Sequence, residues 1–192
     1  MKVILASQSK RRAEILRAHG YRIRVIPARG VCERDTFKRP SALVMHNAME
    51  KARAVAADLS SGIVIGADTI IYFKGRIIGK PRTRKDAFAT VKVLQNDHHT
   101  VYTGVSICDA GSERMRVFYE KTIVTFKKLN DRAISAYLSY IDPMDKAGAY
   151  AIQEHGEMVI KNIKGSIANV IGFPIEAFKR EWARFCRNRS TQ

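Results

Sequence analysis

The sequence of 192 residues has no long hydrophobic stretch, because no run approaches the about 18 apolar residues of a membrane-spanning helix. Its N-terminus becomes polar by Ser7, too early for a secretory signal peptide. These two absences predict a cytoplasmic protein with no membrane association. Apolar residues still make up 46% of the chain, which is enough to form the core of a globular protein.

Cysteine is scarce, and the three cysteines, Cys32, Cys108 and Cys186, lie far apart without the spacing of metal ligands. An odd number of widely separated cysteines predicts neither a disulfide framework nor a zinc site. The five histidines form no ligand cluster either. His98 and His99 are expected in a loop, and no histidine is assigned a role.

Internal repeats, low-complexity segments and linkers rich in proline, glycine or serine are also missing. We therefore predict a single domain over residues 1–192. Periodicity and capping residues predict helices at about residues 9–20, 41–59, 83–94 and 130–143, and from 174 onward. Strands are expected at residues 3–6, 63–65, 69–73, 76–78, 100–108, 116–126 and 158–160. Because parallel crossovers mix with hairpins in this order, the predicted fold class is α/β with a mixed sheet.

Positive charge is abundant, since 34 lysines and arginines oppose 18 acidic residues and give a net charge of +16. Such a surface attracts polyanions and suits nucleic acid, nucleotides or an anionic membrane. Much of the excess falls in segments that are expected to be solvated, such as Lys127 and Lys128. The charge therefore allows nucleic-acid binding but does not predict it.

Asp68 interrupts an apolar run, residues 63–71, that is otherwise typical of a buried strand. An ionised carboxylate in such a place must be paired, bound to a metal or used in chemistry, because burying it alone is costly. A hairpin through Lys74 and Gly75 is expected to bring Lys80 back toward this strand. A carboxylate and an ammonium group at one end of a sheet indicate chemistry on an anion.

Lys51 lies on the apolar stripe of its predicted helix, three residues after Ala48 and four before Val55. It should therefore point toward the sheet, where it would make an ion pair or bind a phosphate. The alternative is that the long side chain reaches solvent at the edge of the helix, which is more common for a single lysine.

Lys10, Arg11 and Arg12 occupy the first turn of the first predicted helix, where the helix dipole disfavours positive charge. A phosphate bound at this helix N-terminus would explain them, since it would accept hydrogen bonds from the guanidinium groups and from Ser7 or Ser9. The alternative, that these cations are exposed and tolerated, is equally consistent with the sequence.

Gln153 follows the apolar residues 149–152, and its amide offers an acceptor beside a donor. This pattern complements the N3–H and carbonyl edge of uracil or thymine. An ordinary glutamine at the end of a strand is the commoner explanation. Glu33 lies in a loop and, taken alone, would be assigned to solvent.

Five segments, in order along nearly the whole chain, resemble the motifs of one family, the Maf-like nucleoside triphosphate pyrophosphatases, once called septum formation proteins. The segments are Leu5-Ala6-Ser7-x-Ser9-x-Arg11-Arg12, Gly66-Ala67-Asp68-Thr69, Gly79-Lys80-Pro81, Asp145-Lys146-Ala147-Gly148-Ala149-Tyr150-x-Ile152-Gln153 and Gly165-Ser166-x-x-Asn169-Val170-x-Gly172-x-Pro174. Each motif alone is weak, but five in register make a chance match implausible.

The resemblance implies a fold like that of Maf and inosine-triphosphate pyrophosphatases: an elongated mixed sheet flanked by helices, with a deep nucleotide cleft between two lobes. It implies a hydrolase of nucleotide metabolism that converts a nucleoside triphosphate to the monophosphate and pyrophosphate. It also implies a divalent metal, with Mg²⁺ expected and Mn²⁺ or Co²⁺ as alternatives, and a homodimer.

Within this family, the combination of Arg12, Thr69 and Gln153 resembles the branch that acts on dTTP, UTP and modified pyrimidine nucleotides. Two departures stand out. Lys10 occupies a position that is usually proline. The loop around Glu33 matches poorly, because Cys32 stands where the family has a second acidic residue.

The resemblance and the residue patterns together give one hypothesis for the site. The catalytic residues are Asp68, Lys51 and Lys80; the substrate-binding residues are Ser7, Arg11, Arg12, Thr69 and Gln153; the metal ligands are Asp68 and Glu33. In this hypothesis Asp68 orients the attacking water, and Lys146 is a further candidate that could equally be structural. The alternatives are a pyrophosphatase for damaged purine triphosphates and, in another class, a basic protein that binds nucleic acid or regulates division.

Overall fold

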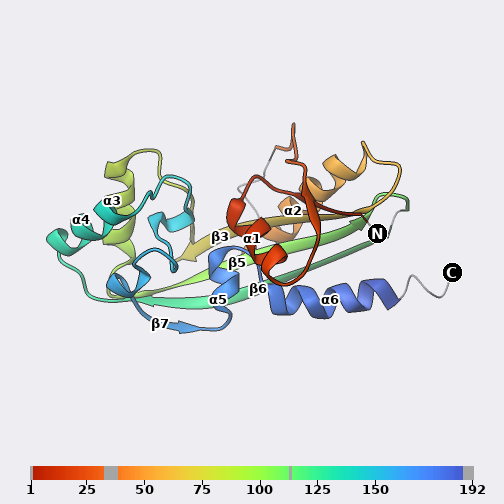
Figure 1. Cartoon of the computed structure of the whole chain (residues 1–192). Helices are drawn as coiled ribbons and strands as arrows, with labels where there is room; N and C mark the ends of the chain where they lie inside the picture. The colour runs from red at the N-terminus through yellow and green to blue at the C-terminus, as the bar shows by residue number, and fades with distance from the viewer. Residues whose placement is uncertain (1, 33–38, 113, 188–192) are drawn as a thin grey trace. The chain divides into compact units, whose positions relative to one another are not determined.

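The computed structural model describes residues 2–32, 39–112 and 114–187, which form a seven-stranded sheet with helices beside it (Figure 1). The elements are β1 (Val3–Ala6), α1 (Lys10–Ala18), β2 (Ile23–Val25), α2 (Pro40–Ala56), β3 (Ile63–Phe73), β4 (Arg76–Ile78), α3 (Arg84–Leu94), β5 (His98–Asp109), β6 (Met115–Phe126), α4 (Asp131–Tyr140), the 3₁₀ turns η1 (Ala147–Ala149) and η2 (Gly156–Met158), β7 (Ile160–Lys164), α5 (Ile167–Ile171) and α6 (Ile175–Arg187). None of the helices in these ranges is both long and apolar enough to cross a membrane.

The sheet is mixed, as the sequence predicts. Its strand order is β2-β1-β3-β5-β6-β7, and β4 pairs with β3 outside this path. β1 runs parallel to both β2 and β3, whereas the β3–β4 and β6–β7 pairs are antiparallel. The α/β fold class with a mixed sheet and flanking helices is therefore confirmed.

The chain divides into two compact units. The first comprises Met1–Asp68, Thr103–Glu120 and Gly172–Gln192, and the second comprises Thr69–Tyr102 and Lys121–Ile171. Because β3, β5 and β6 contribute residues to both, the division does not decide between one domain and two. The single domain over residues 1–192 stays a prediction.

In the first unit, α2 packs directly on two glycines of the sheet. A Cβ atom at Gly66 of β3 would lie 2.0 Å from the carbonyl oxygen of Ala48, and one at Gly104 of β5 would lie 2.2 Å from that of Val44. Only glycine permits such an approach of helix backbone to strand. Figure 1 shows α2 on one side of these strands and α6 on the other.

The second unit has its own apolar core, to which β3, α3, β5, β6 and α4 contribute. Helix α3 begins as predicted, because the Thr83 hydroxyl accepts a hydrogen bond from the Asp86 amide at 3.0 Å. Helix α4 begins after Asn130, whose side chain accepts a hydrogen bond from the Ala133 amide at 2.8 Å. Capping residues therefore marked both helix starts correctly.

Three local predictions were wrong. His98 and His99 do not lie in a loop but begin β5, where His99 is 2% exposed because it packs against Phe126 and Tyr150. The strand expected at 158–160 is instead the turn η2 followed by β7. The strands expected at 63–65 and 69–73 are one continuous strand, β3, since Asp68 is accommodated without breaking it.

Candidate active site

The carboxylate of Asp68 is buried in the first unit and paired with Lys51. Asp68 is 6% exposed, and its Oδ1 lies 2.7 Å from Nζ of Lys51. The lysine side chain is itself only 13% exposed. The prediction that Lys51 points toward the sheet is confirmed, and the alternative of a solvent-reaching side chain is excluded.

Asn47 completes this cluster and was missed by the sequence analysis. Its amide Nδ2 donates a hydrogen bond of 3.1 Å to Oδ2 of Asp68, and the residue is 3% exposed. Each carboxylate oxygen of Asp68 therefore accepts one bond from helix α2. A signal was present, because Asn47 precedes Lys51 by four residues and so lies on the same face of a helix.

The close approach of α2 at Gly66 explains how these groups meet. Gly66 and Asp68 are two residues apart on β3 and therefore project to the same face of the sheet. The helix backbone at Ala48 lies against Gly66, so that Asn47 and Lys51, on the adjoining turns, reach the carboxylate. A side chain larger than hydrogen at position 66 would push the two donors away.

Arg12 lies at the start of α1 and is bound on several sides within the first unit. Its Nη1 donates to the Ser7 hydroxyl at 3.0 Å and to the Ala67 carbonyl at 2.9 Å, and its Nε donates to the Gly172 carbonyl at 3.0 Å. These bonds connect the end of β1 to the residue that precedes Asp68. The alternative of an exposed and merely tolerated cation is therefore wrong for Arg12.

The other groups at this end of α1 differ in exposure. Ser7 is buried, Arg11 is half-buried and Lys10 is exposed. Ser9 caps the helix by accepting a hydrogen bond of 3.4 Å from the Arg12 amide. Phosphate binding by Ser7, Arg11 and Arg12 stays a prediction.

Three predicted site residues belong to the second unit. Thr69 is half-buried on β3, whereas Lys80 and Gln153 are exposed. The loop of Lys80 is tied to the segment that carries Gln153, because the Gly148 amide donates a hydrogen bond of 3.0 Å to the Gly79 carbonyl. Within the second unit, the structure therefore connects the loop that contains Lys80 to the segment that contains Gln153.

Lys146 is the candidate for which structural and catalytic roles were both left open. It is 6% exposed, and its Nζ contacts the Asp142 carbonyl at 2.6 Å, Asp145 Oδ1 at 3.0 Å and Glu154 Oε1 at 3.3 Å. All of these partners lie in or beside the same segment of the chain. This geometry favours the structural role.

The chemistry of the donor set can be compared with that of a divalent metal. No group of three or more histidine, cysteine or acidic side chains that could hold a metal occurs in residues 2–32, 39–112 and 114–187. Mg²⁺, however, is usually bound by one or two carboxylates together with substrate phosphates and water. Asp68 fits this mode, because a carboxylate has about four lone-pair sites. The other predicted ligand, Glu33, lies outside the described residues.

The fold and the cluster of Asp68, Lys51 and Asn47 define an α/β protein whose sheet contains a buried, paired carboxylate. The sequence profile of the family described as Maf-like protein matches residues 2–185. The chain therefore belongs to this family, as its motifs predict.

Several relatives are similar to this chain over nearly their whole length. The dTTP/UTP pyrophosphatase of Elusimicrobium minutum is 42% identical over 180 residues, which cover 94% of this chain and 96% of the relative. The dTTP/UTP pyrophosphatase of Bacillus anthracis is 40% identical over 184 residues, which cover 96% and 95%. Among solved structures, the Ham1 protein of Staphylococcus aureus matches 66% of this chain and 72% of its own, with a TM-score of 0.47 and 14% identity.

Proposed function

We propose that this protein hydrolyses nucleoside triphosphates to the monophosphate and pyrophosphate, with dTTP, UTP and modified pyrimidine nucleotides as substrates. The observation that carries the proposal is the buried Asp68 carboxylate, held by Lys51 and Asn47. The relatives named dTTP/UTP pyrophosphatase support the substrate class. The activity would remove unwanted nucleotides from the cellular pool.

The proposed reaction is the attack of water on the α-phosphorus. The water oxygen forms a bond to phosphorus, the bond from phosphorus to the α,β-bridging oxygen breaks, and pyrophosphate leaves with that electron pair. Asp68 orients the water and accepts its proton, for which a fixed carboxylate is suited. Lys51 adds a positive charge beside the carboxylate. This charge stabilises the negative charge that develops on the phosphate oxygens during the reaction.

Other phosphate and base contacts are assigned on the motif resemblance. Arg11 and Arg12, with Ser7, are proposed to bind phosphates from the start of α1, and Lys80 is proposed to bind phosphate from its loop. Thr69 and Gln153 are proposed to contact the nucleoside, with the Gln153 amide reading the edge of the pyrimidine. The exposure of Lys80 and Gln153 leaves both side chains accessible to a ligand.

A divalent metal, Mg²⁺ in the first instance and Mn²⁺ or Co²⁺ as alternatives, is proposed to be bound by Asp68. When bound, it would neutralise phosphate charge and orient the phosphates for displacement. Omitting the metal should therefore abolish turnover while leaving the fold intact.

A homodimer located in the cytoplasm is also proposed, and sedimentation of the purified protein would test the dimer.

The experiment that tests the function is a substrate panel. Purified protein with Mg²⁺ is assayed against dTTP, UTP, CTP, GTP and ITP, and pyrophosphate release is measured. We expect dTTP and UTP to be the preferred substrates. Preference for ITP or GTP would support the enzyme for damaged purines instead, and equal or absent activity on all five would refute the pyrimidine assignment.

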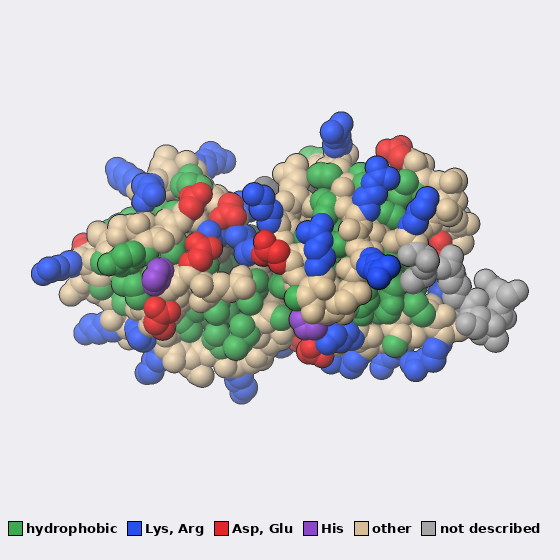
Figure 2. Space-filling view, in the orientation of Figure 1, with side chains coloured by type: hydrophobic (Ala, Val, Ile, Leu, Met, Phe, Trp, Pro, Cys, Tyr) green, Lys and Arg blue, Asp and Glu red, His purple; other side chains and the backbone are tan. Residues whose placement is uncertain are grey.

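Nucleic-acid binding is a second candidate, favoured by the net charge of +16. Figure 2 shows lysine and arginine side chains spread over much of the visible face, with acidic side chains among them. A spread of this kind differs from the basic groove with stacking aromatics that is typical of single-strand binding. Binding to a polynucleotide over a salt series separates the two functions, because phosphate-dominated binding weakens steeply with salt.

A further inference from the structure

Gln153 is an exposed side chain on a segment that the structure anchors on both sides. An amide can select a base by hydrogen bonding only if its position is fixed, because a side chain on a loose segment adapts to either partner. The groups that fix this segment therefore influence selectivity without contacting the substrate. Two of them, Tyr137 and Lys146, lie in the second unit with Gln153.

Tyr137 anchors the chain two residues before Gln153. Its hydroxyl accepts a hydrogen bond of 3.0 Å from the Ala151 amide and donates one of 3.3 Å to the Ala151 carbonyl. One side chain from α4 thus binds both backbone groups of a single residue. Burial raises the pKa of Tyr137 to about 12, so the hydroxyl keeps its proton and both bonds persist at neutral pH.

Lys146 anchors the chain one residue after Gln153. Its ammonium group lies 3.3 Å from Oε1 of Glu154 and is also bound by the Asp142 carbonyl and Asp145. Because Lys146 is 6% exposed and Glu154 is 42% exposed, the lysine is the fixed partner of this pair. Glu154 is therefore held to a buried charge.

Tyr150, which directly precedes Ala151 in the chain, adds a third contact. Its hydroxyl lies 2.8 Å from Nε2 of His99, and the ring packs edge-on against Phe126 with centroids 4.9 Å apart. The segment that leads to Gln153 is thus attached to α4, β5 and β6. Such attachment to rigid elements is how binding geometries are kept fixed.

We propose that Tyr137 and Lys146 are positioning residues for base selection, which hold Gln153 in place by binding Ala151 and Glu154. The proposal rests on the proposed function, since it requires that Gln153 reads a pyrimidine. It assigns to Lys146 a part in specificity that needs no contact with the triphosphate.

The test compares kcat and KM for dTTP and for dGTP in four proteins: wild type, Tyr137→Phe, Gln153→Ala and the double variant. Tyr137→Phe should reduce the ratio of kcat/KM for dTTP to that for dGTP by about tenfold, because the amide is misplaced. The loss should appear in KM for dTTP, with kcat changed by no more than about twofold, because a base contact contributes binding rather than chemistry.

The double variant decides whether Tyr137 acts through Gln153. Adding Tyr137→Phe to Gln153→Ala should change the selectivity ratio by less than about twofold, since residues that act through one another are not additive. A further tenfold loss in that background would overturn the proposal. So would an unchanged ratio in Tyr137→Phe alone.

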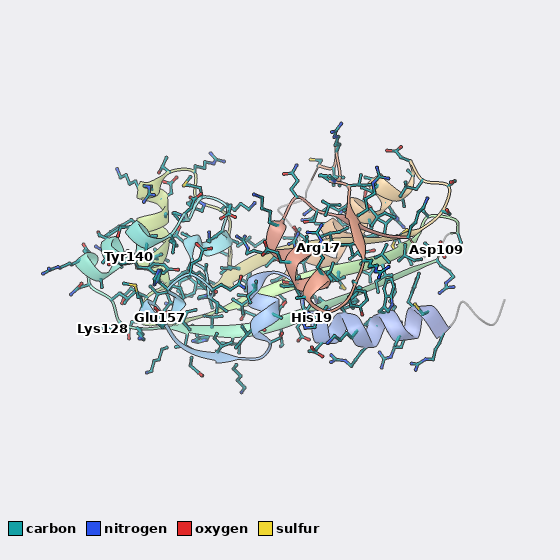
Figure 3. All side chains as sticks on the ribbon, in the orientation of Figure 1. Arg17, His19, Asp109, Lys128, Tyr140 and Glu157 are labelled. Atoms are coloured by element: carbon teal, nitrogen blue, oxygen red, sulfur yellow. The ribbon has the colours of Figure 1, made fainter. Side chains whose placement is uncertain are left out.

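Two further variants guard against a folding effect. Tyr140→Phe changes a tyrosine of the same helix that is 62% exposed and labelled in Figure 3, and it should leave the ratio unchanged. Glu154→Gln weakens the second anchor at an accessible position and should reduce the ratio by about threefold, the effect of a partly exposed ion pair. If Tyr137→Phe does not fold, the ratio in Glu154→Gln decides.

The outcome also separates this proposal from the proposed function. If wild-type protein shows no preference for pyrimidine triphosphates, the function fails and the positioning role fails with it. If wild type prefers pyrimidines and Gln153→Ala loses the preference, but Tyr137→Phe and Glu154→Gln keep it, only the positioning role is refuted.

Discussion

The ammonium group of Lys51 lies 2.7 Å from one carboxylate oxygen of Asp68, with both side chains largely removed from solvent. A buried ion pair of this kind gives little net stability, because desolvation of the charges offsets their attraction, yet removing one partner leaves a costly unpaired charge. The pair is therefore better explained by chemistry than by stability. It fixes a carboxylate and a cation next to each other before any substrate arrives.

Replacing Asp68 with asparagine should reduce kcat by about two orders of magnitude or more, the usual scale for loss of a general base. Asparagine keeps the shape of the side chain but cannot take a proton from water. Pyrophosphate release from dTTP measures the effect. Asp58→Asn, in the exposed turn after α2, is the control and should retain wild-type turnover. An active Asp68→Asn enzyme would mean that another group is the base.

Replacing Asn47 with leucine should reduce kcat by about tenfold, because Asp68 loses one of the two donors that orient it and small misplacements of catalytic groups are costly. The two side chains branch in the same way at Cγ, so α2 should still pack on β3. Kinetics with dTTP and thermal unfolding are measured together, with Glu50→Gln of the same helix as the control. Lower stability with unchanged kcat would show that Asn47 has only a structural role.

Replacing Gly148 with alanine should destabilise the protein by about 2 kcal/mol or more, because a left-handed backbone and an overpacked contact are each unfavourable for alanine. Gly148 has φ +73°, and a Cβ atom there would lie 2.3 Å from Cδ1 of Ile71. Urea unfolding measures the change. Gly79→Ala is the matched control, since an added Cβ meets nothing within 4 Å and φ is not positive there. Equal stability of the two variants would contradict the packing at Gly148.

The buried histidine of β5 should make stability depend on pH. Burial, and to a smaller extent the neighbouring His98, lower the pKa of His99 from 6.5 to about 4, although Asp97 opposes the shift. Below pH 6.5 the unfolded chain therefore binds a proton that the native protein does not. The contribution of neutral His99 is fully present above pH 6.5 and should fall by about 2 kcal/mol by pH 5.

Urea unfolding of wild type and His99→Gln at pH 7.5 and pH 5 tests this expectation. The variant lacks the titrating group, so its stability should fall less than that of wild type between the two pH values. If the two proteins lose the same free energy of unfolding, His99 does not titrate as its burial requires.

Several parts of the site could be predicted because a local pattern carried them. Asp68 stood out as a charge within an apolar strand, and helical periodicity placed Lys51 on the inner face of α2, where it is found. The caps at Thr83 and Asn130 also follow from residues a few positions apart. Such signals depend on neighbours in sequence, so no knowledge of the fold is needed to see them.

Other parts depended on partners far away in the chain. Nothing near His99 in sequence indicates that Tyr150 would cover it, which is why a loop was predicted there. The binding of Ala151 by Tyr137 likewise joins α4 to a segment without regular structure.

By itself, the amino-acid sequence determined the mixed α/β class, the family, and the choice of Asp68 and Lys51 as candidates for catalysis. Tertiary structure alone decided that Asn47 shares the carboxylate, that Arg12 is bound by groups from separate parts of the first unit, and that Lys146 binds groups in its own segment. The reason is physical: periodicity fixes which way a side chain points, but the group it meets is set by how closely helix and sheet can pack. At Gly66 the backbone of α2 can approach β3 closely because glycine has no side chain.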